Sequence, residues 1–301
     1  MREAIFGTLL VILFGGLTVY GTKARQGGVK PESNTITTPT LKFPKQKMNI
    51  EPSEASRKRS QKGCGPVPAS LRSPPYNLDE FYQQYCDADG IPILASSEVD
   101  PEALRIAKRR INVMTQKLSP KVKQAMIDTH TRIAIVGKDE LMTDIPEHSD
   151  LNEAFPEKDW NKHAIGLGPT KDRPAASVRE KNLLCLKGNR LPESDVFVHE
   201  FAHAIHYMGL NNAEPNFQIK LKHAYKEAVI KRGLWKDTYA STNYVEYWAE
   251  AVQIWFNLNY AERGVHENYI NTKAQLKYYD PVLYDLVAQY MPAKSILICP
   301  T

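Results

Sequence analysis

The sequence predicts an α+β fold that is mainly helical and contains a small mixed sheet. Long segments carry apolar residues at the three- and four-residue spacing of a helix with one buried face, and capping residues mark where several of them begin. Shorter runs rich in β-branched residues lie between these segments and are typical of strands. The 301 residues are 42% hydrophobic and 24% charged, which is ordinary for a globular protein with a sizeable buried core.

The helical pattern begins at residue 100. Asp100 is an expected N-cap and Pro101 an expected first helical residue, and apolar residues at helical spacing follow. Ser119-Pro120 marks the start of a second, shorter helix by the same signals. Residues 133–136 are apolar and partly β-branched, and they predict a short buried strand.

The middle of the chain is richer in loops. Residues 138–172 contain several Gly and Pro, and residues 175–186 predict one or two strands that end in the apolar run 183–186. Farther on, residues 217–232 have the pattern of an amphipathic helix, and residues 280–290 that of a terminal helix.

One stretch, residues 196–209, contains the pattern His-Glu-x-x-His. His199 and His203 stand four residues apart, so on a helix they lie on the same face and could bind one zinc ion together. Glu200 follows the first histidine, where its carboxylate could take a proton from a zinc-bound water. The flanking residues are apolar, which favours a buried helix, and Gly209 is expected to end it. An ordinary helix with two incidental histidines is the alternative, but it would bury polar groups without partners.

A zinc site of this kind needs a third protein ligand. His206 is two turns from His199, about 10 Å along the helix, which is too far to share the ion, so we expect it to pack. Glu246 and Glu250 are better candidates, because they stand four residues apart within a strongly apolar helical segment where unpaired carboxylates are costly. One could complete the zinc site, and the other could accept the N–H of a ligand histidine. The alternative is that one or both face solvent at a rim.

In order and spacing, the segments 194–204, 238–243 and 246–251 resemble the catalytic domain of the anthrax-toxin lethal-factor-like metallopeptidases, which are zincins of the gluzincin type. The resemblance covers about residues 100–290, and it implies a zincin-like metallopeptidase fold with one zinc ion (Zn2+) per chain. It also implies the roles of zinc ligand for His199, His203 and Glu246, general base for Glu200, oxyanion donor for Tyr239, and orientation of a ligand histidine for Glu250.

In zincins the strand just before the metal helix edges the active-site cleft, and a substrate pairs with it as an added strand. By position, that strand is the segment 175–186. The resemblance thus predicts a zinc metalloendopeptidase that binds a peptide or protein substrate. One alternative is a zinc-stabilised, non-catalytic binding or toxin-accessory module with the same fold, although holding the metal would not require Glu200. Another is a hydrolase that acts on a non-peptide amide.

Three segments are expected along the chain. Residues 1–21 predict a signal peptide or a membrane anchor, because Ala4–Gly21 is an uncharged apolar run of 18 residues. Residues 22–63 predict a disordered basic linker or a pro-segment, with Arg57–Arg59 as a candidate processing site. Residues 64–301 would then form the zincin-like metallopeptidase domain.

These segments also predict location and partners. A cleaved signal predicts a secreted protein, and a retained segment predicts a single-pass membrane protein whose catalytic domain lies outside the cytosol. A membrane partner is expected only in the second case. The net charge of +5 lies in the linker, where ten Lys or Arg stand against three Glu, and residues 64–301 carry about −2. That distribution predicts no nucleic-acid partner.

The four cysteines predict two disulfides in an exported chain. Three pairings are open. Cys64 with Cys86 would close a local loop, and Cys185 with Cys299 would tie the C-terminal tail to the core. Cys64 could instead be a free thiolate that binds the zinc and inhibits it.

Overall fold

The computed structural model describes residues 11–13, 63–259 and 270–299. The expectations for residues 1–21 and 22–63 therefore fall almost wholly outside the described residues, and the division of the chain into three segments stays a prediction. Within the described ranges, we find no helix with the length and apolar character needed to cross a membrane.

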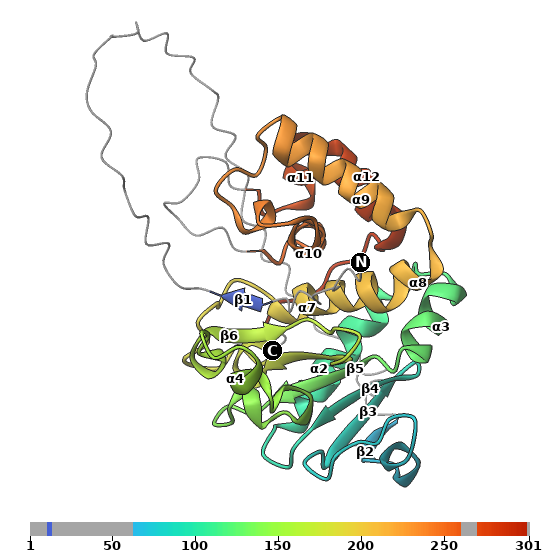
Figure 1. Cartoon of the computed structure of the whole chain (residues 1–301), viewed down its shortest axis with the longest axis vertical. Coiled ribbons are helices and arrows are strands. Elements are labelled where there is room, and N and C mark those ends of the chain that lie inside the picture. The colour runs from blue at the N-terminus through green and yellow to red at the C-terminus, as the bar shows by residue number, and fades with distance from the viewer. Residues whose placement is uncertain (1–10, 14–62, 260–269, 300–301) are drawn as a thin grey trace, which may run out of the picture.

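The fold is of the α+β class and is built on one mixed sheet (Figure 1). Its strands lie in the order β1-β6-β7-β5-β4-β3-β2, and β4, β5 and β7 run parallel while every other pairing is antiparallel. The strands are β1 (Val11–Leu13), β2 (Cys64–Pro66), β3 (Gln84–Ala88), β4 (Ile91–Ala95), β5 (Arg132–Val136), β6 (Ala164–Leu167) and β7 (Ala175–Arg179).

Both faces of the sheet are buried. Along β4, Ile93 and Ala95 belong to the apolar cluster that contains the long helices, whereas Leu94 between them joins a second cluster on the opposite face with Tyr82 and Trp160. Successive side chains of a strand point to opposite faces, so this alternation assigns one face of the sheet to each cluster. The continuous apolar run of β4 is the pattern expected of a strand buried on both sides.

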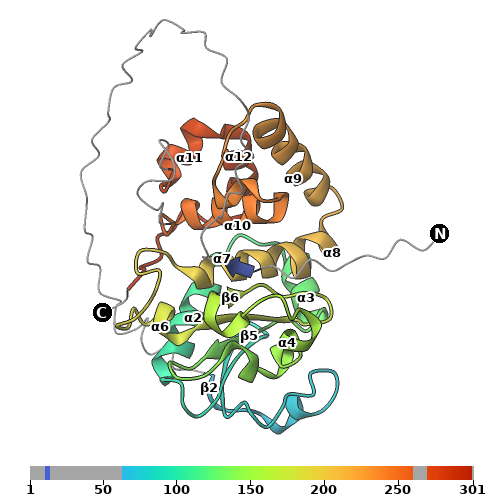
Figure 2. The same ribbon diagram turned by 60° about the vertical axis from the view of Figure 1, so that its left-hand side comes forward.

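The main helices lie on one face of the sheet and beyond it, whereas α4 and α5 supply Leu151 and Trp160 to the cluster on the opposite face. Figures 1 and 2 show α7 lying between the sheet and the C-terminal group of helices. The main helices are α2 (Pro101–Met114), α3 (Pro120–Asp128), α7 (Val196–Ala204), α9 (Phe217–Tyr225), α10 (Tyr244–Trp255), α11 (Lys273–Tyr279) and α12 (Pro281–Tyr290). The shorter ones are α4 (Leu151–Ala154), α5 (Trp160–His163), α6 (Glu180–Leu183) and α8 (Asn211–Ala213).

The predicted helix starts are confirmed at two positions where capping chemistry is local. Asp100 accepts a hydrogen bond from the N–H of Glu102 ahead of Pro101, and Ser119 accepts one from Val122 ahead of Pro120.

The prediction of strands over residues 175–186 is only half right. Ala175–Arg179 form β7, but the chain then turns into α6, where the Glu180 carboxylate accepts the N–H groups of Asp100 and Lys138. A short apolar run does not distinguish a strand from a helical turn. Moreover, β7 lies between β5 and β6, so it is not the edge strand that we expected it to be.

The expectation that Gly209 ends the helix that carries His199 and His203 is wrong. The chain continues through a π-helical turn, Ile205–Leu210, into α8. A Cβ atom on Gly209 would lie 2.9 Å from Cγ1 of Val122, so the missing side chain lets α3 approach the turn closely.

Two disulfides join Cys64 to Cys86 and Cys185 to Cys299. The first links the adjacent strands β2 and β3, and the second fixes the C-terminal segment to the loop that follows α6. The reading of Cys64 as an inhibitory thiolate is wrong, because its sulfur is bonded to Cys86. Disulfides of this kind are typical of proteins that fold in an oxidising compartment.

Candidate metal centre

Helix α7 places His199 and His203 on successive turns of one face, and both side chains are fully buried. The helix starts at Asp195, whose carboxylate accepts the N–H of Val198 at 3.2 Å. The same carboxylate pairs at 2.6 Å with Arg110 of α2, also buried. A buried charge of this kind needs a partner, so the ion pair accounts for an Asp cap inside the core.

Helix α10 brings the third candidate ligand. Asn243 caps its start by accepting the N–H groups of Val245 and Glu246. An indole N–H donated by Trp248 to the main-chain oxygen of Ala202, at 3.0 Å, holds α10 against α7. The two helices thereby face each other across the candidate site.

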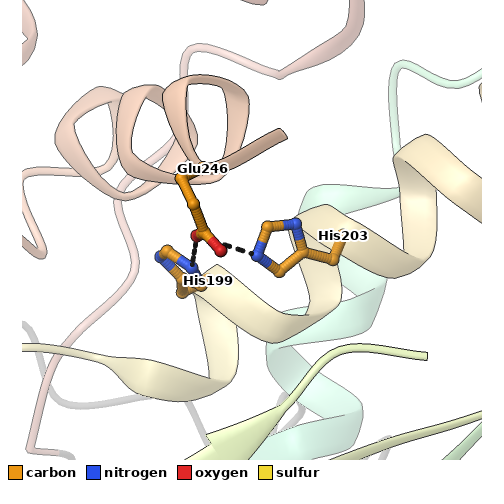
Figure 3. Close-up of side chains that lie close together, drawn as sticks. All are labelled: His199, His203 and Glu246. Atoms are coloured by element: carbon orange, nitrogen blue, oxygen red, sulfur yellow. Dashed lines mark hydrogen bonds and ion pairs between the residues drawn. The ribbon is translucent and has the colours of Figure 1, made fainter. Parts of the chain in front are cut away.

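Glu246 points from α10 toward both histidines (Figure 3). Its Oε2 atom lies 3.0 Å from Nε2 of His199 and 3.4 Å from Nε2 of His203. One ligand atom from each of the three residues lies within 4.8 Å of the others, and all three side chains are buried. The fold thus brings Glu246 next to His199 and His203, although it lies far from them in the sequence. This group could hold a metal ion.

The residues fit a metal ion chemically as well. Neither ring nitrogen of His203 makes a hydrogen bond in the described part of the chain, although the ring is buried. Burial lowers the pKa of His203 to about 4, so the ring is neutral and keeps a lone pair for an ion. Burial would raise the pKa of Glu246, but His203 and His199 lower it to about 2, so this carboxylate is charged. Two imidazole nitrogens and one carboxylate oxygen are a donor set that zinc accepts.

Glu200 lies beside this group; the residue is 2% exposed, and its carboxylate makes no hydrogen bond to any described residue. Burial raises its pKa well above the ordinary value, and the charges of Glu246 and Glu250 raise it further against the opposing effect of His199. A carboxylate with a raised pKa is suited to take up a proton and release it again.

Tyr239 opens the short 3-10 helix Tyr239–Ser241, and its ring centroid lies 6.0 Å from that of His199. Burial raises its pKa, and the charges of Glu246 and Glu200 raise it further. The phenol therefore stays protonated and can act as a hydrogen-bond donor. The loop before it is anchored by the Trp235 indole, which donates to Asp280 at 2.9 Å.

Two acceptors face the other ring nitrogen of His199. The structure places the Glu250 carboxylate 3.2 Å from Nδ1, where it could orient the ring as the resemblance implies. Sequence reasoning missed the second acceptor, Gln253, whose amide oxygen lies closer, at 2.8 Å. The sequence feature that could have indicated Gln253 is its place seven positions after Glu246, on the same side of a mainly apolar helix.

His206 lies outside the His199–His203–Glu246 group. Its ring is fully buried, stacks on Tyr207 with centroids 4.9 Å apart, and meets the edge of Phe217. Burial lowers its pKa to about 3. The ring is therefore neutral and packs among aromatic side chains.

No family model and no curated protein matches the sequence. Among solved structures, the chain is similar to the Pro-Pro endopeptidase PPEP-2 from Paenibacillus alvei, with a TM-score of 0.43 and 22% sequence identity. The similarity covers 65% of this chain and 96% of that one. The function proposed below is therefore derived from the site itself.

Proposed function

We propose that the chain is a zinc-dependent metalloendopeptidase that hydrolyses peptide bonds of protein substrates outside the cytosol. The observation that carries this proposal is the buried group of His199, His203 and Glu246 with the unpartnered carboxylate of Glu200 beside it. Three protein ligands leave a fourth position for water or substrate, as in catalytic zinc sites. A purely structural zinc site would have four protein ligands and no use for a buried base.

Each residue then has a chemical role. His199, His203 and Glu246 would hold the zinc ion, which when bound supplies Lewis acidity and an acidified water. Glu200 takes the proton of the attacking water and returns it to the leaving amine. Tyr239, protonated because its pKa is raised, donates a hydrogen bond to the oxygen that becomes negatively charged.

A peptide would lie along β6. This strand passes beside the site, since a Cβ atom on Gly166 would lie 2.7 Å from Cγ of Glu200, and one on Gly168, just after the strand, would lie 3.0 Å from Cβ of His203. Its outer edge pairs antiparallel with β1, which belongs to the segment predicted to be a signal peptide or an anchor. Removal of that segment would open the edge to an extended substrate, which could add to the sheet as a strand. The two disulfides support the location outside the cytosol.

The test uses the chain without residues 1–21, so that β1 does not cover the edge of β6, with Glu200→Gln and with Glu227→Gln as a control at a partly exposed glutamate that pairs with Lys231. Zinc per chain and cleavage of a mixed peptide library are measured in the same preparations. We expect one zinc in all three proteins and cleavage in all but Glu200→Gln.

Two results would contradict the proposal. Zinc in every protein without cleavage in any would favour the non-catalytic module, and cleavage of other amides but not of peptides would favour a different hydrolase. Cleavage by Glu200→Gln would exclude Glu200 as the base.

A further inference from the structure

Gln253 lies on α10, two turns beyond Glu246, and is 1% exposed. Its amide oxygen lies 2.8 Å from Nδ1 of His199. Its amide nitrogen donates to the main-chain oxygen of Asp195 at 2.9 Å and to Oγ of Ser194 at 3.0 Å. One buried amide thus connects the helix that carries Glu246 to both the cap and the first histidine of α7.

The hydrogen-bond partners of the Gln253 amide nitrogen determine the orientation of the amide group. The main-chain oxygen of Asp195 only accepts hydrogen bonds, so the group that faces it must be the NH2 of Gln253. The amide oxygen then faces His199 and can only accept, so Nδ1 of His199 must carry the hydrogen. The nitrogen left for a metal is Nε2, which is the atom 3.0 Å from Glu246. The fold therefore selects the ring nitrogen that binds the ion.

Glu250 is not an equivalent partner for the same N–H. It lies farther away, at 3.2 Å, and is 15% exposed, and its second oxygen accepts a hydrogen bond from Asn259 at 2.6 Å. The amide of Gln253 holds the ring without adding another charge to a site that already contains the carboxylates of Glu200, Glu246 and Glu250. A neutral acceptor leaves the proton on Nδ1 and avoids further repulsion between like charges.

We propose that Gln253 is a positioning residue of the metal centre. It holds His199 with Nδ1 protonated and Nε2 directed at the ion, and it ties the ring to the start of α7. Residues that orient a ligand histidine in this way raise the affinity of the site for its metal. This inference rests on one part of the proposed function, the binding of a metal ion at this site. It does not require peptide cleavage.

The test compares the zinc-loaded full chain with two variants at this position. Gln253→Met has a similar length but neither accepts nor donates, whereas Gln253→Glu keeps an acceptor and loses the donors toward Asp195. Val252→Ala is the control, because it removes buried apolar atoms from the next position of α10 and lowers stability without removing a polar contact.

Two properties are measured. Zinc affinity comes from competition with a chelator, and the protonation of the His199 nitrogens comes from NMR of protein labelled with 15N-histidine, with assignment from the signals lost in His199→Asn. We expect Gln253→Met to bind zinc about 10- to 100-fold more weakly and to shift the Nδ1–H resonance. We expect Gln253→Glu, which keeps an acceptor for Nδ1 but adds a charge and leaves the main-chain oxygen of Asp195 without its donor, to bind zinc more tightly than Gln253→Met and less tightly than the unmodified chain. We expect Val252→Ala to change neither property.

The inference is overturned if Gln253→Met binds zinc as tightly as the unmodified chain with unchanged His199 resonances. It is also overturned if Val252→Ala weakens zinc binding equally, since lost stability would then explain the effect. Neither measurement uses a substrate. If the chain cleaves no peptide, the proposed function is contradicted, but zinc affinity and the His199 resonances still decide the role of Gln253.

Discussion

Gly166 of β6 and Glu200 of α7 approach so closely that no side chain fits between them. A Cβ atom on Gly166 would lie 2.7 Å from Cγ of Glu200, 2.7 Å from Cγ1 of Val196 and 2.8 Å from Oε1 of Glu200. Heavy atoms do not pack at such distances, so glycine is what allows the strand to lie against the carboxylate. The absence of a side chain at Gly166 thus allows Glu200, the proposed base, to occupy its position.

Gly166→Ala should therefore displace the Glu200 carboxylate while the three metal ligands stay in place. A shift of about 1 Å in a catalytic group can cost on the order of 100-fold in rate, and we expect a loss of this size in kcat. Zinc per chain should stay at one. The control is Gly65→Ala, because a Cβ atom there has no heavy atom within 4 Å. An unchanged kcat in Gly166→Ala would show that Glu200 does not act from the position seen.

Removal of the third ligand should act on the metal rather than on the chemistry. Glu246→Ala leaves only the two histidines of α7, and the chain should bind zinc at least about 100-fold more weakly, a larger loss than that for a residue which only orients a ligand. Chelator competition measures the affinity. Glu227→Ala, at a partly exposed glutamate, should bind zinc normally. Full zinc affinity in Glu246→Ala would remove Glu246 from the ligand set.

The two disulfides should differ in their effect on stability. Cys185–Cys299 spans 114 positions of sequence and Cys64–Cys86 spans 22. In the chain-entropy account, replacing both cysteines by serine lowers the free energy of unfolding by about 5 kcal/mol for the longer loop and about 3 kcal/mol for the shorter one. Urea unfolding of the two double variants compares them directly. The reverse order would mean that native-state contacts, not loop length, dominate.

His148 should make stability depend on pH. Its ring is fully buried, its Nε2 lies 2.9 Å from Oγ of Ser177, and burial lowers its pKa to about 4. In the unfolded chain the pKa is about 6.5, so between these values the unfolded state binds more protons. The stability contributed by the neutral ring is complete above about pH 6.5. It is lost as the pH falls toward 4, by up to about 3 kcal/mol.

The measurement is the difference in free energy of unfolding between the unmodified chain and His148→Asn, followed from pH 7 to pH 4. We expect this difference to shrink by about 3 kcal/mol on going to pH 4. A flat difference for His148→Asn would mean that the ring is not kept neutral by burial.

Local chemistry determined what could be predicted from the sequence. Asp100-Pro101 and Ser119-Pro120 mark helix starts because a cap acts on residues two or three positions away. The spacing of His199 and His203 likewise depends only on the helical repeat. The hairpin of β3 and β4 was missed although its signal is local. Asp89-Gly90 stands at its turn with positive φ at both residues, which is the dipeptide that such hairpins favour.

What could not be predicted depends on distant parts of the chain. The place of β7 between β5 and β6 is fixed by pairing, and no pattern within residues 175–186 reveals its neighbours. The role suggested for Gln253 depends on its contact with His199, which lies 54 positions earlier in the sequence. A glutamine is also common on helix surfaces, so its residue type alone gave no reason to place it in the core.

Arg110 connects parts of the chain that are synthesised at different times. This buried guanidinium pairs with Asp195 at the start of α7 and donates to the main-chain oxygen of Ile298, next to Cys299. A ribosome makes residue 298 well after the three candidate ligands. Until then Arg110 lacks one of its acceptors, and Cys185 lacks its partner. A chain made only as far as residue 297 would therefore carry His199, His203 and Glu246 and still lack both of these contacts.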